Sequence, residues 1–302
     1  MTSPPQWHAT GLNNGPIVAA TYYGVSHLPA WLTYRIGHVG TWIAYHLMRQ
    51  GTNAILENLA VMFPELNRRE REALALRTYR SYARDVIDFI RSLRMTPDAT
   101  RRLVSRLETS ALEQAMAEGR GAILLSGHFG NWEIGGVLFR HLTPYALSVV
   151  ARPEASPAVD RLRREMRTTL GVETVEVRQH LDTALRIRGR LQKNEVVAML
   201  LDRHFGKDYV DVSFFGRQTG FLRTPALLAA LAGAPLVPCF IYREDDGLAV
   251  ECGPLIRVRP DGDRDTNVRE AIQAVATLIE AHGRRYPQYW YQFYPVWPAH
   301  GT

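Results

Sequence analysis

From Gly119 onward the sequence alternates short apolar runs with longer amphipathic segments, and this alternation constrains the fold more than any other feature. The first run, GRGAILLSGH, is bounded by glycines and leads directly into FGNWEIGGVLFRHL, which has helical character. Strands separated by helices need crossover connections, so we expect an α/β fold with a mostly parallel central sheet flanked by helices. Functional side chains in such a fold lie at the carboxyl ends of the strands.

The same alternation places the remaining elements of this region. Further strands are expected at residues 146–152, 172–177, 195–202, 235–244 and 247–255, and helices at 156–171, 180–194, 224–234 and 266–286. Upstream, a long helix is expected at residues 68–93 with Asn67 as its N-cap. Its core-facing stripe is predicted to be Ala73, Leu76, Tyr79, Ala83, Val86 and Ile90, and nothing catalytic is expected on it.

Residues 16–50 form two amphipathic helical stretches with a break at Pro29. Trp31, Tyr34, Trp42 and Tyr45, mixed with His and Arg, are typical of a helix at a membrane interface, although a helix packed on its own domain fits the pattern equally. No run of about 18 uninterrupted apolar residues occurs, so no transmembrane helix is expected, and no cleavable signal peptide is visible. We therefore expect a helical, membrane-associating extension over residues 1–50 and a single α/β domain over residues 51–302.

Charge and cysteine content narrow the possible partners. The 302 residues include 36 basic and 30 acidic side chains, a net charge of +6, and all but two of the basic residues are Arg. Arg suits anionic partners, although a GC-rich genome would also produce this bias. Cys239 and Cys252 are too few for a disulfide scaffold or a four-thiolate zinc site. No nucleic-acid motif accompanies the basic residues, so nucleic acid is not an expected partner.

The end of the first strong strand carries the candidate chemistry. His128 lies in the expected turn and Glu133 in the first turns of the following helix, so the carboxylate could orient one imidazole nitrogen while the other accepts a proton. A His with an acid five residues later is common by chance, so the strand-turn-helix context gives the pair its meaning. Free backbone N–H groups of Gly130 and Asn131 are candidates to bind an oxyanion or a phosphate. His204 follows the same strand as Asp202 and could suggest a metal site together with His128. No third ligand is suitably spaced, so no metal site is expected.

The residues GHFGNWE resemble the His-x4-acid block of the late acyltransferases of lipid A biosynthesis and of phosphatidylinositol mannoside acyltransferases, within the wider lysophospholipid acyltransferase superfamily. Four further blocks agree in order, so the resemblance extends over roughly residues 50–297. They are ENLAVMFPEL, ARPEASPAVDRLRREMRTTLG, the stretch from LLDRHFG to GAPLVP, and YPQYWYQFYPVW.

This resemblance implies His128 as the general base on an acceptor hydroxyl and Glu133 as its partner. It places Asp202 and Arg203 beside the active site, and it implies that Arg152 and Arg167 help to hold anionic groups of the substrates. The family often has Gly before Pro225 and Asp-Gln at positions 202 and 203. This chain has Thr224 and the pair Asp202-Arg203, which leaves the acceptor open.

The implied reaction moves a fatty acyl group from acyl carrier protein or acyl-CoA to a lipid hydroxyl, without a cofactor or metal. The implied location is the cytoplasmic face of the bacterial inner membrane, peripheral or monotopic. The helix at 224–234, with Phe129 and Trp132, is expected to line an acyl tunnel, and Arg161, Arg163 and Arg164 could bind an acidic carrier protein. Two alternatives remain open, a thioesterase or lipid hydrolase that uses the same dyad and a non-catalytic membrane-surface binding protein.

Overall fold

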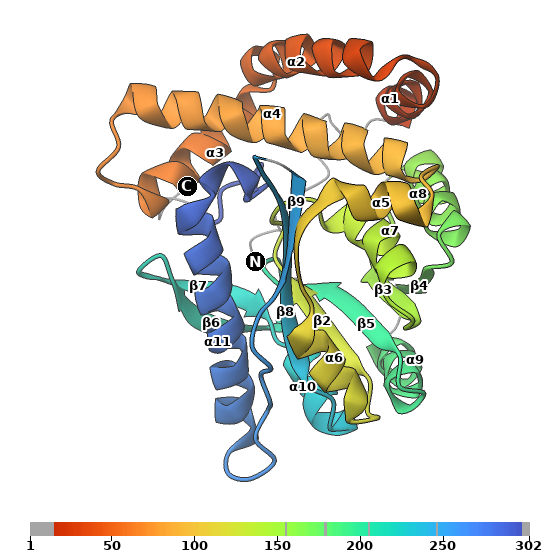
Figure 1. The fold of residues 1–302 in the computed structure, drawn as a ribbon. Helices are drawn as coiled ribbons and strands as arrows, with labels where there is room; N and C mark the ends of the chain where they lie inside the picture. Colours follow the sequence, from red (N-terminus) through yellow and green to blue (C-terminus); the bar gives the residue numbers. More distant parts are fainter. Residues whose placement is uncertain (1–14, 155, 178–179, 205, 246, 298–302) are drawn as a thin grey trace.

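The structure, a computed structural model, describes residues 15–154, 156–177, 180–204, 206–245 and 247–297. Its centre is a seven-stranded sheet in the order β1-β9-β8-β2-β5-β3-β4 (Figure 1). The five strands from β8 to β4 are parallel, whereas β9 is antiparallel to β8 and pairs in parallel with β1. The sheet strands are β1 (Val104–Glu108), β2 (Ala122–Ser126), β3 (Leu147–Ala151), β4 (Glu173–Glu176), β5 (Val196–Leu200), β8 (Leu236–Glu244) and β9 (Gly247–Cys252).

Helices cover both faces of this sheet, and a separate hairpin completes the fold. The hairpin consists of β6 (Tyr209–Phe214) and β7 (Arg217–Leu222). The helices are α1 (Gly15–His27), α2 (Ala30–Leu47), α3 (Arg49–Met62), α4 (Arg68–Ser92), α5 (Pro97–Leu103), α6 (Ser110–Ala117), α7 (Trp132–Leu142), α8 (Pro157–Thr169), α9 (His180–Gln192), α10 (Thr224–Ala232) and α11 (Arg264–Arg285). The predicted α/β class is therefore confirmed. Each strand that the sequence predicts after Gly119 is present, and its observed bounds lie inside the predicted range.

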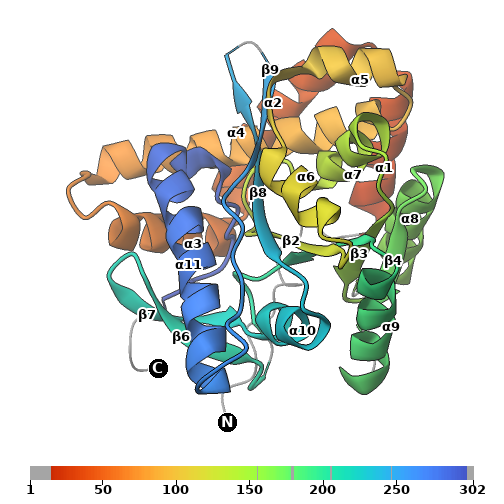
Figure 2. The same cartoon turned by 60° about the horizontal axis from the view of Figure 1, so that its bottom comes forward.

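The two faces of the sheet form two apolar cores. One core combines side chains of α3, α9, α10, α11 and the hairpin with one face of the sheet. The other combines α6, α7 and α8 with the opposite face. Figure 2 shows α10 and α11 on one side of the sheet and α6 and α7 on the other. Such alternation follows from strands that send successive side chains to opposite faces.

Helix α4 begins where the sequence predicts, because Asn67 and Glu70 form a reciprocal capping box. Its predicted core stripe is confirmed only in part, since Leu76, Ala83 and Val86 are half-buried. Of that stripe only Tyr79 and Ile90 are buried, while Ala73 is exposed. The helix is covered on two sides, by α1 and α2 outside and by the rest of the domain inside, so its buried residues do not form one narrow stripe.

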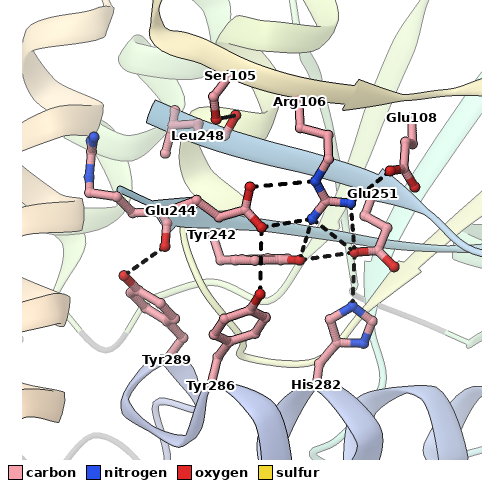
Figure 3. Close-up of polar contacts among 11 residues, drawn as sticks. Ser105, Arg106, Glu108, Tyr242, Glu244, Leu248, Glu251, His282, Tyr286 and Tyr289 are labelled. Atoms are coloured by element: carbon pink, nitrogen blue, oxygen red, sulfur yellow. Dashed lines mark hydrogen bonds and ion pairs between the residues drawn. The ribbon is translucent and has the colours of Figure 1, made fainter. Parts of the chain in front are cut away.

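Edge strand β1 was not expected from the sequence, and a polar cluster ties it to the sheet and to α11 (Figure 3). Arg106 of β1 donates to the Tyr242 hydroxyl at 2.7 Å and pairs with Glu244 at 3.0 Å. Glu251 of β9 accepts from Tyr242 at 2.9 Å and lies 3.5 Å from Nε2 of His282. The cluster joins polar and charged side chains of three strands and one helix, so it ties the edge strand β1 to the rest of the sheet and to α11.

The N-terminal helices α1 and α2 lie on the outer side of α4 (Figure 1). The hydroxyl of Tyr34 on α2 donates to Asp88 of α4 at 2.5 Å, and Arg243 of β8 pairs with the same carboxylate. Among the helices in the described part of the chain, none is both long and apolar enough to cross a membrane.

Candidate active site

Three neighbouring parallel strands end at the candidate site. His128 follows the end of β2, Arg152 follows β3, and Asp202 follows β5, which pairs with both of the others. Their carboxyl ends therefore meet at one edge of the sheet, where the fold was predicted to place functional groups.

Two glycines allow the chain to turn tightly around His128. A Cβ at Gly127 would lie 3.0 Å from Oδ2 of Asp202, so only glycine lets this carboxylate approach without a shift. Gly130 has a φ of +61°, and a Cβ there would lie 1.9 Å from the carbonyl oxygen of Ile241. Both positions are fixed by close packing around the site.

Asp202 holds His128 at two points. Its Oδ1 lies 2.7 Å from Nδ1 of the imidazole, and its Oδ2 accepts from the His128 backbone N–H at 2.8 Å. The Asp202 side chain is fully buried, whereas 17% of the His128 side chain is exposed and faces a cavity. The carboxylate thus fixes both the position of the loop and the orientation of the ring.

The environments of the two groups set their protonation states. Burial, followed by the positive charge of Arg203, lowers the pKa of His128 below its ordinary value, although Asp202 opposes this shift. Burial alone would raise the pKa of Asp202, but the charge and hydrogen bonds of His128, with the charge of Arg203, hold it below its ordinary value. An ionised carboxylate only accepts hydrogen bonds, so Nδ1 carries the proton and the lone pair of a neutral ring is on Nε2.

The segment after α11 supplies the remaining hydrogen-bond donors to Asp202. Oδ2 of Asp202 also accepts from Nε1 of Trp290 at 3.1 Å and from Nε2 of Gln292 at 2.6 Å. Arg203 donates to Oε1 of Gln292 at 2.9 Å and to the carbonyl of Tyr291 at 2.8 Å, so it sets the orientation of the amide. Nothing local in the sequence marks Trp290 or Gln292 as neighbours of Asp202, so neither is predicted as a site residue.

Glu133 was predicted to orient His128, but the carboxylate that accepts the hydrogen bond of Nδ1 is that of Asp202. The Glu133 carboxylate instead lies 3.2 Å from Arg163 and 3.7 Å from Arg167. Arg163 also pairs with Glu154 at 3.2 Å. Glu133 lines the same cavity as His128, so it remains near the site while its partners are guanidinium groups.

The backbone cradle predicted at Gly130 and Asn131 is wrong in its geometry. The Gly130 N–H donates to the carbonyl of Tyr289 at 2.7 Å, and the Asn131 N–H donates to the carbonyl of Ile241 at 2.7 Å. The Asn131 side chain caps α7 by accepting from the Ile134 N–H at 3.1 Å. These N–H groups hold the turn in place and are not available to an oxyanion.

Asp85 is a buried acid on α4, a helix on which the sequence predicts nothing catalytic. It accepts from the Tyr291 hydroxyl at 2.6 Å, and burial raises its pKa to about 7. Its backbone carbonyl accepts from Nδ2 of Asn131 at 3.0 Å. The Tyr291 N–H in turn donates to the carbonyl of His128 at 2.7 Å. Asp85 thus supports the loop of His128 through its hydrogen bonds with Asn131 and Tyr291.

A cavity of about 670 Å³ opens from His128. Glu133, Arg152, Arg163, Arg167 and Arg203 lie in its wall, and most of the remaining lining is apolar. The expected contributions of Trp132 and of the leucines of α10 are present, namely Leu227, Leu228 and Leu231. Phe129 does not take part, because its ring packs in the core against Phe240 and Tyr242. Within the described ranges, no group of three His, Cys, Asp or Glu side chains is placed to hold a metal ion.

The fold and site define an α/β protein with a histidine–carboxylate pair at a strand end, beside a large apolar cavity. A comparison with known families matches residues 9–298 to the bacterial lipid A biosynthesis acyltransferases. The chain therefore belongs to this family.

Curated relatives come from both branches that the sequence resembles. The phosphatidylinositol mannoside acyltransferase of Mycolicibacterium smegmatis is 31% identical over 64% of this chain and 62% of its own length. That of Mycobacterium tuberculosis is 29% identical over 62% of this chain and 58% of its own length. The lipid A biosynthesis lauroyltransferase of Escherichia coli is 27% identical over 76% of each chain. The match thus spans about three fifths of the length of the mycobacterial relatives.

The contacts predict which carboxylate controls the titration of His128. Asp202→Asn removes the charge that most raises the pKa of His128, so that pKa should fall further below its ordinary value. Glu133→Gln removes a weaker influence and should lower the pKa less. Histidine NMR titrations of the wild type and both variants, with circular dichroism to check folding, measure this difference. A larger shift in Glu133→Gln would contradict the assignment.

Proposed function

We propose that this protein is an O-acyltransferase that moves a fatty acyl group from a thioester donor, acyl carrier protein or acyl-CoA, to a hydroxyl of a lipid A-type or other glycolipid or phospholipid acceptor. The observation that carries the proposal is the imidazole of His128, held on Nδ1 by Asp202 and facing the apolar cavity. Membership of the acyltransferase family supports the same reaction class.

In the proposed mechanism, Nε2 of His128 removes the proton of the acceptor hydroxyl while the oxygen attacks the thioester carbonyl. The ring becomes an imidazolium, which the carboxylate of Asp202 stabilises at Nδ1. The tetrahedral intermediate then collapses, the thiolate leaves, and the proton on Nε2 is available to it. Because the hydroxyl attacks directly, the reaction requires no covalent acyl-enzyme.

The cavity is suited to the acyl chain, and its charged rim to anionic parts of the substrates. At about 670 Å³ it lies within the range of pockets that bury a small-molecule ligand. Arg152 and Arg167 lie in its wall, which supports their predicted role with anionic groups. Of the arginines expected to bind a carrier protein, Arg163 pairs with Glu133 and Glu154. Arg164 pairs with Asp160 at 2.7 Å, so these two guanidinium groups are already engaged within the chain.

The distribution of side chains around α2 supports attachment to a membrane surface. It is the reverse of that in an ordinary surface helix, which buries its large apolar side chains. Its inner face toward α4 carries small residues, with Thr33 and Thr41 buried and Gly37 so close that a Cβ would lie 2.9 Å from Ile87. Large apolar side chains are exposed on it instead. We call this set the α2 apolar face: Trp31 (62% exposed), Ile36, Val39, Trp42 (55%), Ile43 and Leu47.

A lipid surface fits this face better than water does. An exposed row of large apolar side chains marks an interaction site, and tryptophan rings favour the depth of lipid headgroups. The first carboxylate of the chain is Glu57, so no acidic residue precedes α3. Basic residues are present instead, and the guanidinium of Arg35 on α2 lies over the Trp31 ring, 5.7 Å from its centroid. Helix α4 lies between α2 and the segment that cages Asp202, which would bring the cavity within one helix layer of the bilayer.

Replacing His128 with Ala should lower kcat/KM for acyl transfer at least about 100-fold, because general base catalysis contributes factors of this size. The assay follows a labelled long-chain acyl group from CoA or carrier protein to a glycolipid acceptor by mass spectrometry. His27→Ala, at an exposed histidine of α1, is the matched control and should keep wild-type activity.

Two outcomes would count against this proposal. Near wild-type transfer by His128→Ala would remove the general base. Release of free fatty acid at a rate independent of added lipid would favour the hydrolase instead.

Introducing two negative charges into the α2 apolar face should weaken the binding of the protein to lipid. Trp31→Glu/Trp42→Glu should bind vesicles of anionic phospholipid at least about tenfold less, since burying each large apolar side chain contributes about 1.5–3 kcal/mol. Vesicle co-flotation measures the bound fraction. Leu185→Glu, at a 56% exposed position on α9, controls for added charge elsewhere. Equal binding by the double variant and the wild type would exclude this face as the attachment site.

A further inference from the structure

Cys239 and Cys252 are the only cysteines of the chain, and the fold brings them together. They are direct partners in the antiparallel register of β8 and β9, and their sulfur atoms lie 3.4 Å apart. Both side chains also lie in the wall of the apolar cavity. Neither has a part in the proposed acyl transfer, so the contact calls for a separate explanation.

The backbone around the pair has the geometry that a disulfide needs. The Gly253 N–H donates to the carbonyl of Pro238 at 2.7 Å. This hydrogen bond between the strands therefore joins the residue before Cys239 to the residue after Cys252. Cys239 and Cys252 are therefore a non-hydrogen-bonded pair, whose Cα atoms lie about 4.5 Å apart. Disulfides join residues whose Cα atoms are about 4.4–6.8 Å apart. The sulfur atoms can thus reach a bonding distance of about 2.05 Å by side-chain rotation, without moving the strands.

We propose that Cys239 and Cys252 form a reversible intramolecular disulfide, an oxidative modification site in the wall of the cavity. The oxidant is a low-molecular-weight disulfide. The Cys252 thiolate attacks one of its sulfur atoms, the small S–S bond breaks, and one small thiolate leaves and takes up a proton. The Cys239 thiolate then attacks the Cys252 sulfur of the mixed disulfide and releases the second small thiol, so the protein loses two electrons and the small disulfide gains them.

Burial decides the order of these two steps. Cys239 is buried, whereas Cys252 is half-buried. The hydrogen bond between the two thiols and burial both raise the pKa of Cys239 well above its ordinary value, which makes it the weaker first nucleophile. Cys252 therefore reacts first with the external disulfide, and Cys239 resolves the intermediate.

The test uses the folded, full-length protein and oxidised glutathione. After oxidation, remaining thiols are alkylated, and intact and peptide mass spectrometry identify the products. The wild type should lose two hydrogen masses, resist alkylation and give a Cys239–Cys252 linked peptide, and dithiothreitol should restore both thiols. Cys239→Ser cannot resolve the intermediate, so it should accumulate a single glutathione adduct on Cys252.

Cys252→Ser should react more slowly than Cys239→Ser, because its remaining thiol is buried. A wild type that keeps glutathione adducts under conditions that modify Cys239→Ser would overturn the proposal. Disulfides between two copies of the chain, in place of the internal bond, would overturn it as well. Both readouts are masses, so they are independent of whether the protein transfers acyl groups.

Discussion

The fully buried carboxylate of Asp202 is the interaction on which the site depends. Removing a charge from water is costly, and this one is stabilised by four hydrogen bonds from His128, Trp290 and Gln292. The donors come from two distant parts of the fold, since His128 follows β2 while Trp290 and Gln292 follow α11. The carboxylate therefore unites the strand ends with the C-terminal segment, and His128 gains a fixed tautomer.

That C-terminal segment is itself anchored from the opposite end of the sequence. Nδ2 of Asn58 on α3 donates to the carbonyl of Tyr294 at 2.8 Å, and its Oδ1 accepts from the Val296 N–H at 2.9 Å. Asn58 is buried, so its amide is matched to the backbone that it holds. This contact ties the ENLAVMFPEL block, which lies far from His128 in sequence, to the segment that hydrogen-bonds Asp202.

The sequence predicts the parts of the fold whose signals are local. The strands after Gly119 are short apolar runs between helices, and Asn67 with Glu70 marks the start of α4, so both were predicted correctly. Strand β1 was missed because VSRLE has no continuous apolar run and its burial depends on distant partners such as Glu244. In α4, contacts on two sides spread the buried residues beyond the predicted stripe.

The site was predicted only in part, for the same reason. His128 follows from the alternation of strands and helices, whereas Arg152 and Asp202 were placed at the site by the family resemblance. The orienting carboxylate was assigned to Glu133 because it is near in sequence, whereas the structure brings Asp202 to Nδ1 across 74 residues through the pairing of β2 and β5. Nor does a sequence reveal that the N–H groups of Gly130 and Asn131 already have backbone acceptors. Such contacts depend on tertiary packing, which local patterns do not encode.

The central claim is that a neutral His128, held by Asp202, takes the proton of the acceptor. The pH dependence of kcat/KM for acyl transfer tests it most directly. Activity should fall at low pH along a limb set by the pKa of His128, below its ordinary value of 6.5. In Asp202→Asn the plateau should drop and this limb should move to still lower pH, because the raising influence of the carboxylate is lost. A limb that stays in place in Asp202→Asn but moves in Glu133→Gln would contradict the account.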